Sequence, residues 1–519
     1  MKHLMSLAGL SVAGLMLVSC STQVKEANYQ VIPLPQEISV MEQAAPFILS
    51  DGTKIMYPEG NERMQKNAEF LASYIKDLTG KSLSVQAGTE GKGILLQLGG
   101  SSENPEGYQL KVTDANVVIS GPTEAGVFYG IQTLRKSIPV VQGMDIALPA
   151  VEISDYPRFS YRGAHLDVSR HFFPVDSVKR FIDMLALHNI NRFHWHISDD
   201  QGWRIEIKSR PELTEIGSKR TETVIGHNTG KYDGQPYGGF YTQEEIKEMV
   251  AYAAERQIEV VPEIDMPAHS NSALAAYPHL ACPVVKEYIG VLPGLGGRNS
   301  EIIYCAGNDS VYAFLQDVMD EILELFPSRY IHIGGDEARK TYWEKCPLCQ
   351  ARMKKEKIAN EEDLQGYFMN RMSEYVRSKG REVIGWDELT NSSFLPDDAI
   401  ILGWQGYGQA ALKAAEKGHR FIMTPARIMY LIRYQGPQWF EPLTYFGNNT
   451  LKDVYDYEPV QKDWKPEYAD LLMGVQACMW TEFCNKPEDV DYLVFPRLAA
   501  LAEVAWTQPE KKDWTSFLK

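Results

Sequence analysis

Beyond residue 158 the chain alternates between short apolar segments typical of strands and amphipathic segments typical of helices. This alternation restricts the fold most, because parallel strands need crossover connections and helices usually supply them. Eight such β/α units predict a (β/α)8 TIM barrel, with a doubly wound open sheet as the alternative that the pattern leaves open. Strands are expected at 161–167, 192–198, 259–263, 330–334, 382–386, 399–404, 420–423 and 474–480, and helices at 175–187, 243–256, 311–326, 361–379, 410–417 and 489–506.

The preceding segment, residues 29–155, has a different order of elements. Short strand segments are expected at 93–98, 107–112 and 116–120, and amphipathic helices at 61–78 and 123–136. This order predicts an α/β fold with a small α/β domain at 29–155 in front of a barrel at 156–519. Within the barrel, the long loops at 199–241 and 264–309 are suited to building a site above the strands.

The N-terminus has the features of a targeting segment. Lys2 and His3 precede an apolar stretch that is too short for a comfortable membrane span and leads into Leu17-Val18-Ser19-Cys20. This end resembles the lipobox of bacterial lipoproteins. We therefore expect a signal peptide at 1–19, a lipid on Cys20, a polar tether at 20–28, and a place in the bacterial cell envelope, in the periplasm or on the outer membrane. A plain secretory peptide with an incidental Cys20 is the alternative, and both export the chain.

Charge and composition restrict the partners. Lys and Arg total 52 against 68 Asp and Glu, which gives a formal net charge of −16. This charge repels phosphate backbones and removes the electrostatic basis of nucleic-acid binding, so neutral substrates are expected. No Gly-rich phosphate loop follows a strand, and no cofactor is expected. Membrane contact is expected only through the lipid anchor, and the oligomeric state is left open.

The cysteines carry a weaker prediction. Cys346-Pro-Leu-Cys349 is a lone CxxC without a second Cys or His pair at zinc-finger spacing. We therefore expect a local disulfide or free thiols there and no metal site. Cys282 and Cys305 flank a loop rich in Gly and Pro that they are able to staple. Cys478 is expected to be a small buried residue.

Polar and aromatic residues stand at the ends of most of the expected strands. Each of them alone has a structural explanation, as an ion pair or a packed ring. In a TIM barrel, however, the C-terminal ends of the strands build the active site, so their recurrence there predicts one. The residues are Arg162 in the first strand, Asp199 and Asp200 after the second, Glu263, Asp265 and His269 on the third, Asp336 and Glu337 on the fourth, Trp386, Asp387 and Glu388 on the fifth, Trp404 on the sixth, and Trp480 and Glu482 on the eighth.

Asp336 and Glu337 are the strongest catalytic candidates. Gly334-Gly335 precede them and allow the backbone to turn, so that both carboxylates reach one cavity. A close pair of carboxyl groups resists double ionisation, and one member then keeps a proton, as a general acid must. A helix N-cap or a solvated turn is the structural alternative for an isolated sequence of this kind.

Taken together, these segments resemble glycoside hydrolase family 20, the β-N-acetylhexosaminidases, over almost the whole chain that follows the targeting segment. The resemblance implies a small α/β domain followed by a catalytic TIM barrel. The matching segments are 105–108, 126–130, 162–163, 167–170, 194–196, 199–204, 262–267 and 332–337.

The resemblance implies an exo-acting hydrolase that removes terminal β-linked GlcNAc or GalNAc from oligosaccharides or glycoconjugates. The implied mechanism is retaining and substrate-assisted, through an oxazolinium intermediate. Glu337 would be the general acid and base, Asp336 would orient the acetamido group, and Tyr430 would bind its oxygen. Trp386, Trp404 and Trp480 would form aromatic walls, Arg162 and Glu482 would hold ring hydroxyls, and Asp199, Asp265 and His269 would form a supporting network.

The chain departs from the family at two places. Family members commonly have Tyr-Leu-Asp at the tyrosine, whereas Tyr430 and Leu431 are followed here by Ile432 and Arg433. Ile432 cannot accept a hydrogen bond, so either recognition near O4 is relaxed or Arg433 admits an anionic or substituted sugar. The smaller departure is an alanine in place of the usual glycine before His269.

Two other functions compete with this prediction. A non-catalytic glycan-binding lipoprotein on the same scaffold would keep the aromatic walls, although the presence of Asp336, Glu337 and Tyr430 argues against it. A metal-dependent hydrolase is suggested by His194-x-His196 near Asp199, but a neutral sugar held by aromatic strand ends does not need a metal.

Overall fold

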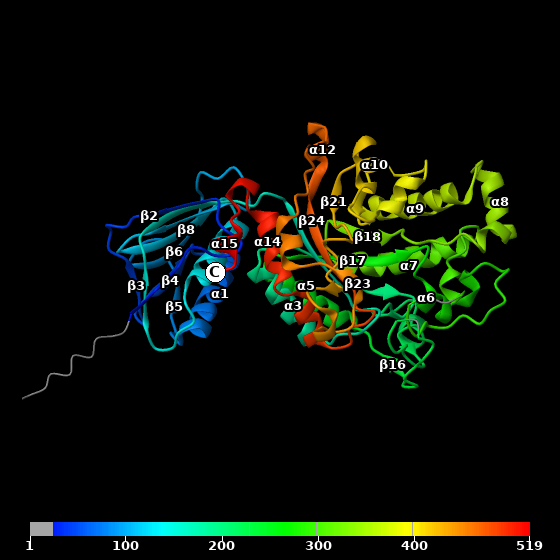
Figure 1. Ribbon diagram of the computed structural model, residues 1–519, viewed down its shortest axis with the longest axis horizontal. Helices are drawn as coiled ribbons and strands as arrows, with labels where there is room; N and C mark the ends of the chain where they lie inside the picture. Colours follow the sequence, from blue (N-terminus) through cyan, green and yellow to red (C-terminus); the bar gives the residue numbers. More distant parts are fainter. Residues whose placement is uncertain (1–23, 228, 296–297, 397) are drawn as a thin grey trace, which may run out of the picture.

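The computed structural model describes residues 24–227, 229–295, 298–396 and 398–519. The chain forms an N-terminal α/β domain and a larger barrel domain that lie side by side, with the C-terminal segment returning to the N-terminal domain (Figure 1). The expected signal peptide at 1–19 and the lipid site at Cys20 lie outside the described residues.

The N-terminal domain contains a seven-stranded mixed sheet with the order β2-β10-β7-β8-β6-β4-β5 and a small sheet with the order β1-β9-β3. Part of the expected tether is wrong, because Val24–Glu26 is strand β1 and pairs with β9. Other bounds are β2 Glu37–Val40, β3 Phe47–Leu49, β4 Lys54–Tyr57, α1 Glu62–Thr79, β5 Ser84–Ala87, β6 Gly93–Leu98, β7 Tyr108–Val112, β8 Asn116–Gly121, α2 Glu124–Ser137, β9 Asp145–Leu148 and β10 Val151–Asp155.

Both long helices of this domain begin and end where their sequence predicts. The Asn61 side chain accepts a hydrogen bond from the Met64 N–H at the start of α1, and Gly80 ends the helix with φ 76°. The Thr123 side chain caps α2 in the same way. Each helix buries an apolar stripe, which carries Leu71 and Ile75 in α1.

The second domain is a closed barrel of eight parallel strands in the order β11-β12-β17-β18-β19-β20-β21-β24. Strand β11 pairs with β24 and closes the circle, so the TIM barrel is confirmed and the open sheet is excluded. The strands are β11 Tyr161–Asp167, β12 Arg192–His196, β17 Glu259–Met266, β18 Tyr330–Gly334, β19 Glu382–Trp386, β20 Ile400–Gly403, β21 Phe421–Met423 and β24 Leu472–Met479.

One of the expected helices outside the barrel differs in the structure. The expected helix at 489–506 is two helices, α13 and α14, because Pro496 has no N–H for the helical ladder. The helices are α3 Val175–Leu187, α4 Glu212–Glu215, α5 Gln243–Glu255, α6 Asn271–Ala276, α7 Asp309–Leu325, α8 Pro347–Glu356, α9 Glu361–Ser378, α10 Ala410–Glu416, α11 Leu451–Asp456, α12 Pro466–Leu471, α13 Pro487–Val494, α14 Arg497–Trp506 and α15 Trp514–Phe517.

The loops at the C-terminal ends of the barrel strands carry short pairs of strands. They are β13 Ser198–Asp199 with β14 Gly202–Trp203, β15 Lys219–Arg220 with β16 Tyr237–Gly238, and β22 Arg433–Tyr434 with β23 Tyr445–Asn448. After β19, the chain forms the 3-10 helix η4, Asp387–Asn391, where other units have a longer helix.

The two domains meet through buried polar contacts. Arg162 at the start of β11 forms two hydrogen bonds of 2.9 Å with the carboxylate of Glu106. The indole N–H of Trp506 in α14 donates to Asp155, with both oxygens at 3.0 Å. Because Arg162, Trp506 and Asp155 are buried, the contacts tie the domains together with defined geometry.

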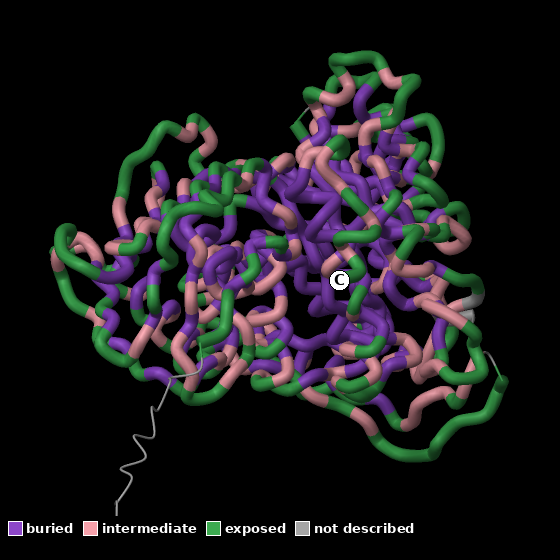
Figure 2. Tube along the Cα trace, turned by 60° about the vertical axis from the view of Figure 1, so that its left-hand side comes forward, coloured by how far each residue is buried: buried purple, intermediate pink, exposed green. Residues whose placement is uncertain are grey.

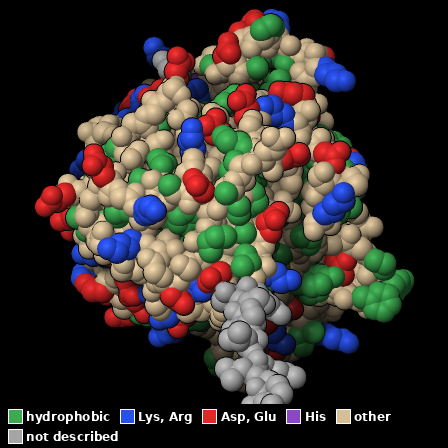
Figure 3. Space-filling view, turned by 90° about the vertical axis from the view of Figure 1, so that its left-hand side faces the viewer, with side chains coloured by type: hydrophobic (Ala, Val, Ile, Leu, Met, Phe, Trp, Pro, Cys, Tyr) green, Lys and Arg blue, Asp and Glu red, His purple; other side chains and the backbone are tan. Residues whose placement is uncertain are grey.

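Burial and charge follow this architecture. The barrel strands are buried along their length, while the outer loops are exposed (Figure 2). Acidic and basic side chains are interspersed over the face of the N-terminal domain that Figure 3 shows. Among the described residues, no helix has the length and apolar character needed to cross a lipid bilayer.

Candidate active site

A cavity of about 700 Å³ opens at the C-terminal ends of the barrel strands. A volume of this size accommodates a terminal sugar and part of what is attached to it. Residues that follow each of the eight barrel strands contribute to its walls, as expected for the active face of this fold. They include Arg170, Asp200, His269, Asp336, Glu337, Glu388, Trp404, Tyr430, Arg433, Tyr445, Trp480 and Glu482.

The backbone at the end of β18 turns sharply to present the two adjacent carboxylates. Gly334 has φ 72° and Gly335 has φ 106°, conformations that residues with side chains rarely adopt. A Cβ atom at Gly334 would lie 1.7 Å from the Oδ1 of Asp265. Glu337 itself has φ 47°, which is uncommon for a non-glycine residue and is typical of functional sites.

His269 connects the two carboxylates. Its Nε2 lies 3.5 Å from Asp336 Oδ2 and 3.4 Å from Glu337 Oε2, and its Nδ1 lies 3.1 Å from Asp199 Oδ1. Asp265 lies in the same group and accepts from the Gly335 N–H at 3.3 Å. The expected supporting network of Asp199, Asp265 and His269 is therefore assembled around the carboxylate pair.

Protonation in this network follows from its charges. Burial lowers the pKa of His269, but the charges of Asp199 and Asp336 outweigh it and hold that pKa well above the ordinary value. His269 is therefore a cation at neutral pH. Burial together with the charge of Asp336 raises the pKa of Asp265 well above its usual range.

From the sequence, the closeness of the two carboxyl groups was expected to keep one of them protonated. Glu337 does not follow this expectation. The hydrogen bond from His269 lowers the pKa of Glu337, with burial opposing. The imidazolium compensates the charge that would otherwise build up on the two acids. Glu337 is the more accessible of the pair, with its side chain 62% exposed against 12% for Asp336.

Two buried carboxylate oxygens in the cavity wall are candidates for substrate contacts. Within the described part of the chain, no donor reaches Asp336 Oδ1 or Glu482 Oε2. A buried acceptor without a partner costs about 1–3 kcal/mol, so a ligand that donates to it gains affinity. Glu482 is otherwise held by the Tyr445 hydroxyl, which donates to its Oε1 at 2.9 Å.

The arginine of the site is Arg170, and the expectation for Arg162 is wrong. Arg162 lies at the N-terminal end of its strand, where its guanidinium is buried against Glu106 and does not line the cavity. Arg170 follows the C-terminal end of the same strand, and its guanidinium reaches Asp199 at 3.0 Å and Glu482 at 3.4 Å. Only the arginine that follows the C-terminal end of the strand lines the cavity.

The aromatic walls are formed by two of the three expected tryptophans together with Tyr430. Trp404 stacks on Tyr430 with ring centroids 6.0 Å apart and planes 11° apart, and Trp480 lies 5.9 Å from Tyr430. Trp386 is different, because it is 1% exposed and donates its indole N–H to Glu263. Trp386 packs 6.0 Å from Trp480 and is not among the residues that line the cavity, so its expected contact with the sugar stays a prediction.

Sequence reasoning assigned no role to Glu388. It accepts a hydrogen bond from the indole N–H of Trp404 at 2.9 Å. Burial and the charges of Asp336 and Asp387 raise its pKa to about 9, so it is protonated at neutral pH. The signal in the sequence that could have revealed its role is its position directly after Trp386 and Asp387 at a strand end. In the structure, Glu388 orients the wall residue Trp404.

Below the cavity, Glu263 joins a cluster of histidines. Its Oε2 lies 2.8 Å from His194 and 2.6 Å from His196, and its Oε1 lies 3.2 Å from His332. Such groups are able to hold a metal ion. The carboxylates of Glu263 and Asp199 bind both ring nitrogens of His196 and, against burial, raise its pKa to about 10, so it acts as a donor rather than a ligand.

Family models match both domains of the chain. "Glycosyl hydrolase family 20, catalytic domain" matches residues 159–509, and "Glycosyl hydrolase family 20, domain 2" matches residues 28–156. The chain belongs to glycosyl hydrolase family 20. The resemblance stated from the sequence motifs is thereby confirmed.

Members of family 20 with curated names are similar over most of the chain. A beta-hexosaminidase of Porphyromonas gingivalis is 39% identical over 97% of this chain and 65% of its own length. A beta-hexosaminidase of Vibrio furnissii is 34% identical over 92% of this chain and 76% of its own. The chain thus spans somewhat less than two thirds of the first relative.

Solved family 20 structures share the fold. The N-acetyl-beta-hexosaminidase of Streptomyces plicatus, in complex with Thio-NAglucal, has a TM-score of 0.80 and 35% identity, and the match covers 94% of this chain and 92% of that one. The exo beta-N-acetylglucosaminidase of Vibrio harveyi, in complex with N-acetylglucosamine, has a TM-score of 0.81 and 31% identity, covering 95% of this chain and 76% of that one.

Proposed function

We propose that the protein is an exo-acting β-N-acetylhexosaminidase that removes terminal β-linked GlcNAc or GalNAc from oligosaccharides or glycoconjugates. The observation that carries this proposal is the placement of His269 within 3.5 Å of both Asp336 and Glu337 at the mouth of a cavity walled by Trp404, Tyr430 and Trp480. Relatives named for this activity support it.

The chemistry proceeds in two steps with retention. The carbonyl oxygen of the substrate's own 2-acetamido group bonds to the anomeric carbon while the bond to the aglycone oxygen breaks, and Glu337 gives that oxygen its proton. Asp336 Oδ1 accepts the acetamido N–H, and its charge stabilises the oxazolinium ring. Glu337 then takes a proton from water, which attacks the anomeric carbon and reopens the ring.

The site also bears on which sugar enters. Ile432 is fully buried and does not line the cavity, whereas the neighbouring Arg433 does. Of the two alternatives left by the sequence, the position of Arg433 supports acceptance of a sugar with an anionic substituent. Replacing Arg433 by Gln should lower kcat/KM for a sulfated N-acetylglucosaminide more than for the unsubstituted one. An equal loss on both substrates would refute the role of Arg433 in binding an anionic substituent.

Removing the acid tests the catalytic proposal. Glu337→Gln should lower kcat about 100- to 10,000-fold on a natural glycan. The loss should be smaller on an aryl glycoside with an acidic leaving group, because that oxygen needs little protonation. Glu344→Gln, the same change at an exposed position of the same loop, is the matched control. Unchanged kcat in Glu337→Gln would refute the assignment.

A non-catalytic glycan-binding protein is the remaining alternative. It predicts tight binding of N-acetylhexosamine glycans without turnover at any pH. Release of free N-acetylhexosamine by the wild-type protein, with loss in Glu337→Gln, would exclude it. The presence of both carboxylates, Asp336 and Glu337, beside His269 favours the enzyme, because binding alone does not need a proton donor.

We also propose that the chain is exported and anchored to the bacterial envelope by a lipid on Cys20. The support is the sequence Leu17-Val18-Ser19-Cys20 after an apolar stretch. Labelled palmitate should be incorporated into the wild-type protein and not into Cys20→Ser. Unlabelled, soluble protein in the periplasm from both would favour the plain secretory peptide.

A further inference from the structure

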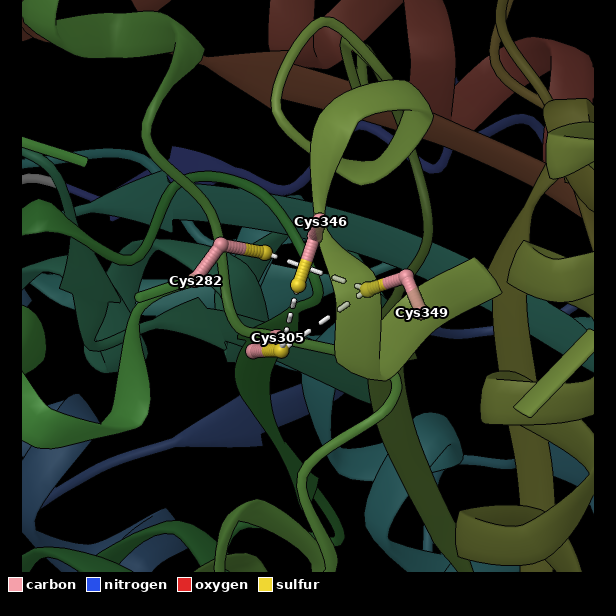
Figure 4. Close-up of side chains that lie close together, drawn as sticks. All are labelled: Cys282, Cys305, Cys346 and Cys349. Atoms are coloured by element: carbon pink, nitrogen blue, oxygen red, sulfur yellow. Dashed lines mark hydrogen bonds between the residues drawn. The ribbon is translucent and has the colours of Figure 1, made fainter. Parts of the chain in front are cut away.

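Outside the cavity, four cysteine side chains converge on one point (Figure 4). Cys282 and Cys305 come from the loop after β17, and Cys346 and Cys349 come from the segment after β18. All four are buried, with exposures of 2% or less. The sulfur atoms of Cys282 and Cys349 are 3.8 Å apart, and that of Cys305 lies 3.7 Å from both Cys346 and Cys349.

These distances distinguish a metal site from a pair of disulfides. A disulfide brings two sulfurs to about 2.05 Å and leaves each with one partner. Here Cys305 is equally distant from two sulfurs, and Cys349 approaches two as well. A tetrahedron with Zn–S bonds of about 2.3 Å has sulfur–sulfur edges of about 3.8 Å, which matches the observed separations.

The backbone holds the four residues in this arrangement. Cys346 precedes α8 and Cys349 lies in its first turn, the short C-x-x-C spacing typical of zinc ligands. Gly307 allows the other segment to approach, because a Cβ atom there would lie 2.1 Å from the carbonyl carbon of Leu348. The Cys305 N–H donates to the Leu280 carbonyl at 2.9 Å and fixes that strand of the loop.

We propose that Cys282, Cys305, Cys346 and Cys349 bind one structural Zn²⁺ ion. Each thiol releases its proton to solvent on binding, and four thiolates around the ion leave a net charge of −2. Four sulfur ligands in tetrahedral arrangement favour Zn²⁺ over Mg²⁺ or Ca²⁺, which prefer oxygen. The sequence did not show this site, because the second pair is separated by the loop from 283 to 304 rather than by two residues.

The ion would join two loops of the active site. Cys282 follows His269 by thirteen residues, and Cys346 follows Glu337 by nine. None of the four cysteines lines the cavity, so their contribution to activity is positional. Holding these segments together keeps His269 near Asp336 and Glu337, as a zinc site with no open coordination position is able to do.

Metal analysis of the full-length exported protein tests the proposal without reference to activity. Elemental analysis by mass spectrometry should find one zinc per chain, and a mercurial reagent that displaces thiolates should release it. Replacing the ion by Co²⁺ should produce the visible absorption bands of a tetrahedral cobalt–thiolate centre. These measurements use the wild-type chain and do not depend on whether a variant folds.

Variants then assign the ligands. Cys349→Ser should lower the zinc content at least several-fold and lower the melting temperature, while Cys484→Ser, a change at another buried cysteine, should keep one zinc. Four reduced thiols without metal would overturn the proposal. So would two disulfides, seen as a loss of four hydrogens in the intact mass, or one equivalent of iron in place of zinc.

Discussion

The contact between Arg162 and Glu106 permits a sharp separation of stability from catalysis. Glu106→Gln keeps the shape of the side chain and removes its charge, so that Arg162, which is 1% exposed, loses its only carboxylate partner among the described residues. Because Arg162 lies at the N-terminal end of β11, away from the cavity, the change should lower stability and leave the kinetics unaltered.

The magnitude follows from burial. Removing one partner of a buried ion pair costs about 3–5 kcal/mol. The Glu106 side chain is 19% exposed, and the glutamine carbonyl still accepts a hydrogen bond, so the lower end applies, at about 3 kcal/mol. In a chain of this length, that loss should lower the melting temperature by roughly 3 °C.

The assay pairs thermal unfolding with hydrolysis of an aryl N-acetyl-β-glucosaminide. Glu152→Gln is the matched control, because its ion pair with Lys111 has both side chains more than half exposed. That exposed pair should contribute less than about 1 kcal/mol. Arg170→Lys supplies the opposite pattern, with kcat/KM reduced through loss of the contacts to Asp199 and Glu482.

The pH dependence gives a second check. Burial raises the pKa of Glu106, but the charge and hydrogen bonds of Arg162 bring it below the ordinary value. The carboxylate therefore stabilises the fold above about pH 4.3, and this contribution is lost as pH falls further. The difference in stability between wild type and Glu106→Gln should narrow below about pH 4. A raised KM with an unchanged melting temperature would refute the reasoning and return Arg162 to the substrate site.

Two further perturbations test the geometry around the carboxylates. His269→Asn removes the cation that lowers the pKa of Glu337, so the alkaline limb of the kcat/KM profile should move to higher pH; a shift to lower pH would contradict the assigned contact. Gly334→Ala places a Cβ against Asp265 and should lower activity at least tenfold, whereas Gly380→Ala, with φ 81° and nothing within 4 Å, should cost only about 1–2 kcal/mol of stability. If Gly380→Ala lowered activity as much as Gly334→Ala, the clash with Asp265 would not be the cause, and the positive φ alone would explain both losses.

Much of the fold was predictable because it follows from local patterns. The strand and helix periodicities place all eight barrel strands within a few residues of their observed bounds. The helix expected at 489–506 was the exception. Its apolar pattern continues across Pro496, which has no N–H for the helical hydrogen bonds, and the structure has two helices there. The end of the expected tether was also missed, because a three-residue strand such as β1 is stabilised only by its neighbour β9.

The carboxylate pair was predictable from its neighbours, since Asp336 and Glu337 follow two glycines at the end of an apolar strand. The roles of the arginines were not. The expected strand at 161–167 already put Arg162 near its N-terminal end and Arg170 just past its C-terminal end, but only the tertiary structure shows Arg162 bound to Glu106 and Arg170 in the cavity wall. The depth of Trp386 below the wall likewise depends on packing against Glu263 and Trp480.

By itself, then, the sequence determined the barrel, the preceding domain, the family and the adjacent carboxylates at the end of the fourth strand, because each depends on residues that are close along the chain. Tertiary structure decided which groups meet across long separations. The imidazolium of His269 between two carboxylates and the convergence of Cys282 and Cys305 on Cys346 and Cys349 depend on loop closure. Loop closure brings together segments whose spacing along the chain carries no signal of contact.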